Sequence, residues 1–496
     1  DDMRMTGKRH PYASSFKIGL TKDLKIEAFE AEFLQNSGAA ADLSPAIAER
    51  TLFHATNSYF IPNVKTTVYS CKTNLPPNTA FRGFGGPQGM FVIESAIAKA
   101  ADELRIDKNK IQEANLLEEN NEFSYGQIAK EVQAKNTWFS AKEKFDLEKL
   151  KKEVEIFNTE NQLYKKGISL MPIAFGISFT NTSMNHARAL IHIYQDGSVG
   201  VSTGAVEMGQ SVNTKMLQVA QAILGISASK LKIETTNTTR VANTSPSAAS
   251  STADLNGKAV EMACNLLIKR LTTVAAKMLL SSEEKILFKK DFIFVDGKKS
   301  ELTWNALIAQ AMLERVSLSE NAHYATPIIN FDKTKEKGHP FAYHVYGTAI
   351  TTVTVDCIRG IYEIENVKIV HDFGKSMNIG IDIGQVEGAL VQGIGWMTME
   401  EISYNKEGKL LSNSLSTYKI PDIFSSPKII ETIPLETAGN EMAIRKSKAV
   451  GEPPLMYGIG VYFAIQQAVK EFNPNYKLKF NAPFTPEKVL MGLYEK

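Results

Sequence analysis

Small-residue loops that run straight into apolar helical stretches recur along this chain, and they constrain its fold more than any other sequence feature. The first turn of a helix exposes unpaired N–H groups and the positive end of its dipole, which together favour an anion. Glycine and alanine in the preceding loop let a ligand approach the backbone closely. Five such loops precede predicted helices, at residues 81–86, 207–211, 243–252, 382–385 and 451–454. If these loops converge in the fold, they form a pocket for a large polar cofactor that carries phosphate.

Helix and strand patterns are mixed along the whole chain, which indicates the α+β class. Two segments show β-rich runs on both sides of a tight turn, residues 187–203 and 346–371. Three segments carry apolar residues at helical spacing and are predicted helices, residues 212–224, 255–271 and 455–472.

Two Lys/Glu-rich stretches bear on the domain organisation. We expect the first, residues 142–152, to contain a domain junction, which divides the chain into residues 1–145 and residues 146–496. The second, residues 282–299, is typical of a solvated helix face or a surface insertion.

The charge balance argues against a nucleic-acid partner. The formal net charge is +2, whereas a nucleic-acid footprint needs many clustered Lys and Arg residues. No run of about 18 apolar residues occurs, so we expect no membrane span. The three cysteines are far apart and form no Cys-x-x-Cys motif, which favours free thiols in a reducing, cytoplasmic compartment.

The sequence also limits which redox groups this chain can hold alone. An iron–sulfur cluster normally needs four cysteine ligands, and the chain has three cysteines. Its eight histidines never occur at metal-site spacing such as His-Glu-x-x-His, so a bound metal would take its ligands from something other than side chains. The glycines of residues 83–86 do not match the dinucleotide fingerprint Gly-x-Gly-x-x-Gly, which excludes NAD or FAD binding by this chain.

Seven short motifs occur in an order and at spacings that cover nearly the whole chain. They are FRGFGGPQG (81–89), FGISFT (175–180), EMGQ (207–210), NTSPSAASSTADLNG (243–257), DIGQVEGALVQGIG (382–395), TYKIPD (417–422) and KAVGEPP (448–454). Together they resemble the xanthine dehydrogenase/oxidase branch of the molybdenum hydroxylase family. The resemblance implies two elongated molybdopterin-binding domains of mixed sheets and helices, the first of them incomplete.

The resemblance also implies a cofactor and a reaction. In this family, molybdenum carries oxo, hydroxyl and sulfido ligands and is held by the dithiolene of molybdopterin, which in many bacteria is a cytosine dinucleotide. These enzymes hydroxylate a heteroaromatic or aldehyde carbon with an oxygen derived from water. The protein surrounds the metal with contacts that tune it.

The motif matches assign roles around this cofactor. Glu452 matches the general base of the GEPP motif, which would take a proton from the molybdenum-bound hydroxyl. Arg82 and Ala249 match residues that lie beside the metal without ligating it. The resemblance gives the remaining cofactor contacts to Gly83, Gln210, Ser250 and Gln385.

Five further residues match substrate positions of the family. Arg50 matches the arginine that faces a purine oxygen, where it would stabilise the negative charge that builds on the ring during attack. Phe84 and Phe179 match two rings that clamp a planar substrate, and Thr180 matches a substrate-contacting threonine. Met184 stands where the family often has leucine, in a stretch of the substrate funnel that is more polar here. Ser211 replaces a usual glycine after EMGQ.

Parts of the family's site are expected outside these residues. The glycine-rich GGGFGGKE loop and the glutamine that contacts the molybdenum oxo group would precede Asp1. Iron–sulfur clusters and FAD would lie on partner domains or chains and pass electrons to NAD. The resemblance thus implies a component that oxidises hypoxanthine or xanthine toward urate. The alternatives are a related hydroxylase of aldehydes or other N-heterocycles, and a fragment that is cofactor-free and catalytically silent in isolation.

Overall fold

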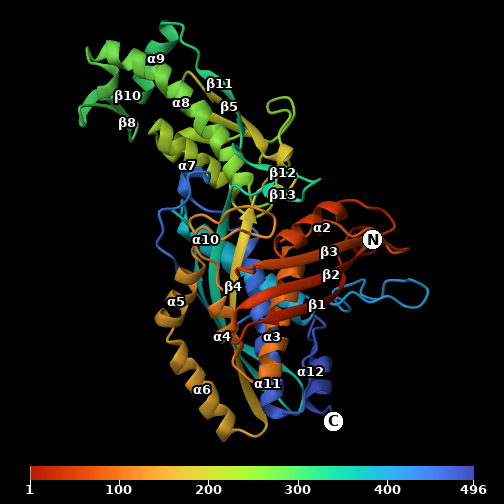
Figure 1. The fold of residues 1–496 in the computed structure, drawn as a ribbon. Helices are drawn as coiled ribbons and strands as arrows, with labels where there is room; N and C mark the ends of the chain where they lie inside the picture. The colour runs from red at the N-terminus through yellow and green to blue at the C-terminus, as the bar shows by residue number, and fades with distance from the viewer. Residues whose placement is uncertain (1, 496) are drawn as a thin grey trace.

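A central four-stranded sheet organises the computed structural model, which describes residues 2–495 (Figure 1). The strand order is β16-β15-β14-β4. Strand β14 is antiparallel to β4 and β15, whereas β15 and β16 are parallel. The strands are β4 (Tyr164–Ile177), β14 (Tyr343–Asp356), β15 (Tyr362–His371) and β16 (Ile429–Pro434).

Strand β4 is apolar along most of its length because both faces of the sheet are covered. Met171 and Ile173 belong to a hydrophobic core that includes residues of α10 and α11. Leu170 and Ala174, at the alternate positions, belong to a second core that includes residues of α5. Side chains of a strand point alternately to its two faces, so one strand fills two cores. The helices are α5 (Ala134–Lys144), α6 (Leu147–Glu160), α10 (Ile379–Thr398), α11 (Gly458–Phe472) and α12 (Pro486–Leu493).

A three-stranded sheet from the first part of the chain packs beside this body. Its order is β1-β2-β3, and the long helix α3 packs against it in the second core. The elements are α1 (Asp2–Met5), β1 (Tyr12–Leu20), β2 (Ile26–Gly38), α2 (Ser44–Phe53), β3 (Asn63–Lys72), α3 (Gly86–Leu104) and α4 (Lys108–Ala114).

An upper lobe with its own hydrophobic core makes the molecule elongated (Figure 1). Its sheet has the order β11-β5-β6-β7, and the helices α7 and α8 pack against each other beside it. The elements are β5 (His186–Ile193), β6 (Val199–Thr203), α7 (Val212–Leu224), β7 (Leu231–Ile233), α8 (Thr252–Met278), β8 (Ile286–Lys289), β9 (Phe292–Val295), β10 (Lys298–Thr303), α9 (Trp304–Leu313) and β11 (Ser319–Ala325). A small hairpin, β12 (Asn330–Asp332) with β13 (Lys337–His339), follows this lobe.

The structure confirms the α+β class and both predicted β segments. Residues 187–203 form the antiparallel pair β5 and β6, and residues 346–371 fall in β14 and β15. Helix α7 ends at Leu224 and is followed by Gly225 with φ of 68°, as the glycine there predicted.

Three local expectations were wrong. Residues 382–385 lie inside α10 rather than before it, because the Asn378 side chain caps the helix four residues earlier. Residues 453–457 form a short 3-10 helix, so α11 starts only at Gly458. Residues 282–299 contain the strands β8 and β9 and the start of β10, so the helix-face alternative for this stretch was wrong, whereas a surface insertion is not contradicted.

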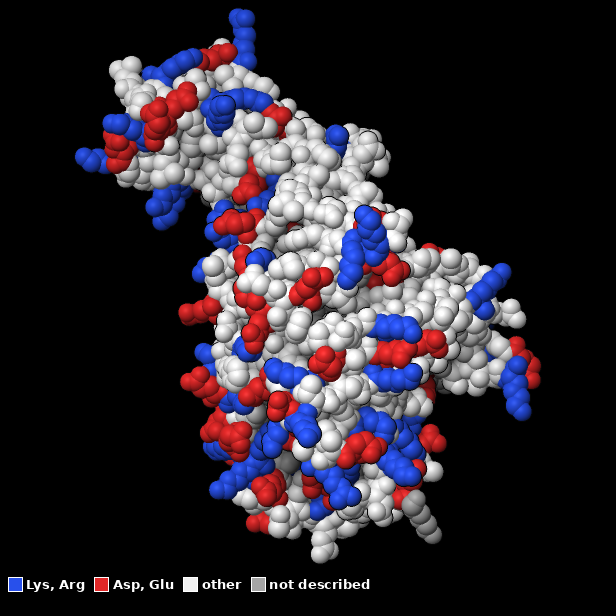
Figure 2. Space-filling model, in the orientation of Figure 1, with Lys and Arg blue, Asp and Glu red and all other residues white. Residues whose placement is uncertain are grey.

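Positively and negatively charged side chains are interspersed on the surface. Figure 2 shows Lys and Arg interspersed with Asp and Glu over the lower body, with a largely uncharged band toward the upper lobe. None of the helices described for residues 2–495 combines the length and apolar composition that a membrane crossing requires.

Candidate active site

Hydrogen bonds connect four of the five small-residue segments between the body and the upper lobe, and the fifth, EMGQ, is joined to them through the residue before it. The backbone N–H of Gly83 donates to Glu452 Oε1 at 3.1 Å, and the Ser250 hydroxyl donates to Glu452 Oε2 at 2.9 Å. The Arg82 guanidinium donates to Gln385 Oε1 at 3.4 Å. The backbone N–H of Val206 donates to the Ser247 hydroxyl at 2.7 Å, which connects the EMGQ loop to the loop before α8. The predicted convergence of these loops is therefore present in the fold.

Arg50 reaches this place from α2 although its side chain is only 1% exposed. One guanidinium nitrogen, Nη2, donates to the carbonyls of Gly176 and Ser178 at 2.8 and 2.9 Å. The other, Nη1, lies 3.8 Å from Glu452 Oε2. Burial lowers the pKa of the Arg50 guanidinium, and the nearby Glu452 carboxylate opposes this shift. The result is a buried cation whose position is fixed by the end of β4.

Glu452 is held on three sides by the contacts above, and its side chain is 13% exposed. It is the residue before the 3-10 helix Pro453–Tyr457, and no capping bond from its side chain to that helix is present. Its carboxylate points instead toward Gly83 and Ser250. A helix-capping role therefore does not account for this glutamate.

Arg82 connects the loop before α3 to α10 and to the GEPP segment. Its Nε donates to the carbonyl of Gly451 at 2.5 Å, and its Nη1 donates to Gln392 at 3.2 Å. The carbonyl of Arg82 in turn accepts from Arg9 at 2.8 Å. The sequence reading found Arg82 but missed Arg9 and Gln392. Residues 382–395 do contain Gln392, so the motif was the available signal for it.

The loop before α8 adopts a backbone conformation that suits small residues. Ala249 and Ser250 have φ of 56° and 54°, in the left-handed region that L residues rarely occupy. This conformation turns the Ser250 hydroxyl onto Glu452. Strain of this kind persists where neighbouring structure fixes the backbone, which occurs often at functional sites.

In the EMGQ loop the structure shows that Glu207, which the motif did not single out, organises the turn. Its carboxylate accepts from the backbone N–H groups of Gly209, Ser211 and Asn213, at the start of α7. Gln210 folds back on its own loop, accepting from Met208 N at 2.6 Å and donating to Val206 O at 2.8 Å. Each end of the Gln210 amide makes one bond within the loop, which leaves one N–H and one oxygen lone pair for a bound molecule.

The predicted substrate residues lie on two segments that flank the Arg50 contacts. Phe179 and Thr180 follow β4, where Asn185 accepts from Phe179 N at 2.8 Å and donates to Phe179 O at 3.0 Å. Met184 ends the 3-10 turn Thr182–Met184 of the same segment. Phe84, on the loop before α3, has φ of 49°. Among residues 2–495 neither Phe84 nor Phe179 packs its ring against another aromatic ring, and both are half-buried.

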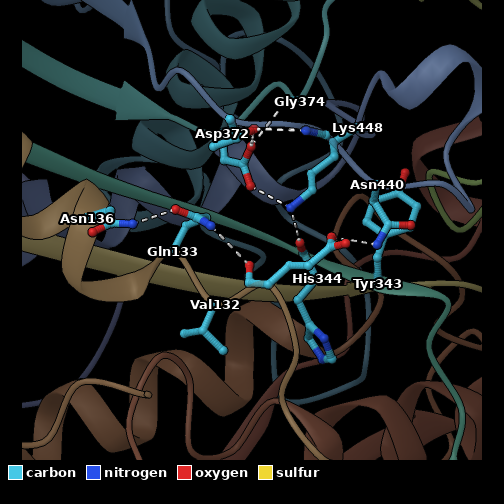
Figure 3. Close-up of polar contacts among 12 residues, drawn as sticks. Val132, Gln133, Asn136, Tyr343, His344, Asp372, Gly374, Asn440 and Lys448 are labelled. Atoms are coloured by element: carbon cyan, nitrogen blue, oxygen red, sulfur yellow. Dashed lines mark hydrogen bonds and ion pairs between the residues drawn. The ribbon is translucent and has the colours of Figure 1, made fainter. Parts of the chain in front are cut away.

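A buried ion pair fixes the segment that leads to Glu452, and the sequence reading missed it. Lys448 Nζ donates to Asp372 Oδ2 at 2.5 Å and to the carbonyl of His344 at 3.1 Å (Figure 3). The other Asp372 oxygen accepts from the backbone N–H of Gly374 at 3.0 Å. Both charged side chains of the pair are at most 2% exposed.

The donors around this site suit an anionic, polar cofactor better than a metal bound by side chains. Within residues 2–495, no three His, Cys, Asp or Glu side chains come close enough together to hold a metal ion. At Gly209, in the EMGQ loop, and at Gly384, inside α10, an added Cβ would meet nothing within 4 Å. The groups that meet here include the Arg82 guanidinium, the Gln385 amide and the Ser250 hydroxyl, which suit a polar, anionic group.

Comparisons with known proteins identify the kind of domain that this chain contains. Residues 140–427 and residues 1–116 each match a family model described as a molybdopterin cofactor-binding domain. The chain is 41% identical to xanthine dehydrogenase/oxidase of Felis catus over 99% of its length and 37% identical to xanthine dehydrogenase 1 of Arabidopsis thaliana over 100%. It spans only 36% of the length of either relative.

A solved structure shares the fold. Quinoline 2-oxidoreductase from Pseudomonas putida 86 superposes with a TM-score of 0.88 at 20% identity, over 100% of this chain and 63% of that one.

Proposed function

Residues 1–496 belong to the molybdenum hydroxylase family as a portion of its molybdopterin-binding region, and we propose that they supply most of a site for purine hydroxylation. In this proposal, hypoxanthine or xanthine is oxidised toward urate with an oxygen derived from water. The observation that carries it is the 3.8 Å approach of the buried Arg50 guanidinium to the Glu452 carboxylate. The names of the relatives, xanthine dehydrogenase and oxidase, support the same substrate class.

The loops that converge at this site fit a molybdopterin. The residues that would hold it are Arg82, Gly83, Gln210, Ala249, Ser250 and Gln385. When bound, this group supplies the water-derived oxygen and takes up the two electrons of the oxidation. Arg82 and Ala249 would lie beside the metal without ligating it. The proposal covers both forms of the pterin, with and without a cytosine dinucleotide.

Glu452 acts in this proposal as the general base. Its carboxylate is fixed by the Gly83 N–H and the Ser250 hydroxyl, so it meets an incoming proton without first reorganising. Removing that proton turns the water-derived oxygen into a nucleophile toward an electron-poor ring carbon. The hydrogen bonds from Gly83 and Ser250 keep the carboxylate oriented while its charge changes.

Arg50 stabilises the charge that develops on the substrate. Attack on a purine carbon moves negative charge onto the ring, and a guanidinium already fixed by two carbonyls is pre-organised to meet it. Phe84 and Phe179 would clamp the flat ring from either side, with Thr180 and Met184 completing the pocket wall. A flat heterocycle fits such aromatic contacts better than a small aldehyde does.

The remaining parts of the enzyme belong to the proposal as well. Iron–sulfur and FAD domains or subunits, the upstream part of the molybdopterin domain, and NAD as acceptor would complete the electron path in the cytoplasm. We also propose the domain division at residue 145, where α5 has ended and α6 is about to begin. Neither a nucleic acid nor a membrane is a partner in this proposal.

Metal and pterin analysis of the full-length enzyme, combined with turnover of three substrates, tests the function. We expect molybdenum and pterin in the assembled enzyme and faster turnover of xanthine and hypoxanthine than of a simple aldehyde. Preference for the aldehyde would favour the related aldehyde or N-heterocycle hydroxylase instead. For residues 1–496 expressed alone we propose a cofactor-free, silent module, because the chain spans 36% of its relatives.

A further inference from the structure

The buried carboxylate of Asp254 connects the upper lobe to the segment that carries Glu452. Asp254 lies in the first turn of α8 and is 7% exposed. Its Oδ1 accepts from the backbone N–H of Ile444 at 2.9 Å, and its Oδ2 accepts from the Tyr343 hydroxyl at 2.6 Å. Tyr343 belongs to β14 of the central sheet, so this carboxylate connects α8 of the upper lobe to the body and to the segment at Ile444.

The Tyr343 hydroxyl passes this connection on to the catalytic segment. Its oxygen accepts from the backbone N–H of Ala449 at 3.0 Å, three residues before Glu452. The Glu452 carboxylate then accepts from Ser250, which precedes Asp254 on the loop before α8. Asp254, Tyr343, Ala449, Glu452 and Ser250 thus form a closed ring of hydrogen bonds and short chain segments.

The ion pair next to Ala449 secures the same segment from the other side. Lys448 is bonded to Asp372 and to the carbonyl of His344, the residue after Tyr343 (Figure 3). Strand β14 therefore holds both Lys448 and Ala449, one through a backbone carbonyl and one through a phenol. Between this anchor and Glu452 only Val450 and Gly451 remain, which leaves little freedom for the glutamate.

We infer that Asp254 and Tyr343 are positioning residues for Glu452: through the hydrogen bond to Ala449 N they set where its carboxylate lies. This inference rests on the proposed role of Glu452 as general base. Neither residue needs to touch the substrate. Loss of the Tyr343 hydroxyl frees the Ala449 amide and lets the segment shift, and small displacements of a catalytic group reduce the chemical step rather than binding.

The neighbouring Tyr346 provides a matched control for this inference. It lies on the same strand, its side chain is fully buried, and its hydroxyl has no hydrogen-bond partner within residues 2–495. Tyr343→Phe and Tyr346→Phe remove the same atom from the same strand. They differ in that only the first hydroxyl connects Asp254 to Ala449. Asp254→Asn is a second test, because an amide replaces one of two accepting oxygens.

The experiment compares these three variants with the wild type in the full-length enzyme. Amide hydrogen exchange is followed in peptides that span residues 445–452. Steady-state kcat and KM for xanthine are measured per bound molybdenum. For Tyr343→Phe we expect exchange of the Ala449 amide about tenfold faster. We expect kcat per molybdenum to fall about tenfold to a hundredfold with KM unchanged. Asp254→Asn should change both in the same direction, and Tyr346→Phe should change neither.

Two results overturn the inference. The first is an equal effect of Tyr343→Phe and Tyr346→Phe on amide exchange or on kcat. That result would show that the bond from the Tyr343 hydroxyl to Ala449 has no special role in placing Glu452. The second is a loss of activity in Tyr343→Phe that follows a proportional loss of molybdenum, which would make its role one of cofactor retention. Failure of the proposed function looks different, since the wild type itself would then lack molybdenum or purine turnover. The exchange comparison would still decide whether the hydroxyl holds Ala449.

Discussion

The guanidinium of Arg50 lies 3.8 Å from the carboxylate of Glu452, where the loops before α3 and α8 meet the GEPP segment. Each partner is fixed by other contacts. Arg50 is bonded to two carbonyls at the end of β4, and Glu452 is bonded to Gly83 and Ser250. Charged groups that are already fixed in place need not rearrange when charge develops on a bound substrate. This pre-organisation is usually the largest part of electrostatic catalysis.

Replacing Glu452 by glutamine should abolish most turnover while the cofactor stays bound. The amide keeps the size of the side chain and can still accept from the Gly83 N–H, but it cannot take a proton. We expect kcat to fall about 10²- to 10⁴-fold, the usual contribution of a general base. Turnover, molybdenum and pterin are measured together, with the exposed Glu436→Gln as control. A fully active Glu452→Gln enzyme would remove the role assigned to this residue.

Replacing Arg50 by methionine should weaken both purine turnover and the fold. The carbonyls of Gly176 and Ser178 lose their donor, which costs about 1–3 kcal/mol for each group left unsatisfied. We expect a lower melting temperature and a fall in kcat/KM that is larger for xanthine than for a simple aldehyde. An unchanged ratio between the two substrates would show that Arg50 does not select purines.

Replacing Ala249 by phenylalanine should prevent cofactor binding. Ala249 has φ of 56° on the loop whose next residue contacts Glu452, so a large side chain would project beside the site. We expect the molybdenum and pterin content of the full-length enzyme to fall. The melting temperature of residues 1–496 expressed alone should change little. The matched control is Ala248→Phe, one position earlier at an exposed residue. Normal molybdenum content in Ala249→Phe would place the cofactor away from this loop.

Breaking the buried pair between Lys215 and Asp382 should destabilise the contact between α7 and α10. Lys215 Nζ lies 2.7 Å from Asp382 Oδ1, with side chains 8% and 0% exposed. Removing one charge leaves the other buried without its partner, which costs about 3–5 kcal/mol. Thermal unfolding of Lys215→Met should show this loss, and the double variant Lys215→Met/Asp382→Leu should recover most of it. Equal stability of the single variant and the wild type would contradict this account.

The buried imidazole of His344 should make the fold less stable in acid. Burial, followed by the charge of Lys448, lowers the pKa of His344 to about 3. Below pH about 6.5 the unfolded chain takes up a proton that the folded chain refuses, so stability falls toward pH 3 by up to about 1.4 kcal/mol per pH unit. Above pH about 6.5 this contribution is complete.

The pH effect can be isolated with a single variant. His344→Gln removes the titrating group but keeps a side chain that can accept from the Tyr125 hydroxyl. Melting temperatures measured between about pH 7 and about pH 5 should fall less steeply for the variant than for the wild type. Parallel curves would mean that His344 is not the source of the acid sensitivity.

The sequence by itself determined the features that depend on neighbouring residues. Alternating and helical apolar patterns predicted β5, β6, β14, β15 and α7, because side-chain direction along a strand or helix follows directly from backbone geometry. Motifs such as KAVGEPP and EMGQ likewise pointed to a cofactor site from short stretches alone. Two sequence expectations were wrong for local reasons: the Asn378 cap starts α10 before residues 382–385, and the charged stretch after α8 forms the β8–β9 hairpin.

The tertiary structure alone decided which distant residues meet. Nothing in the stretches around Arg50, Asp254 or Tyr343 states their partners, because those partners lie far away in the sequence. Burial of the apolar residues of β4 on both faces of the central sheet brings α2 and the GEPP segment together, and packing of α8 brings Ser250 to Glu452. The sequence therefore indicated the chemistry proposed for Glu452, and the packing of the cores decided which residues surround it.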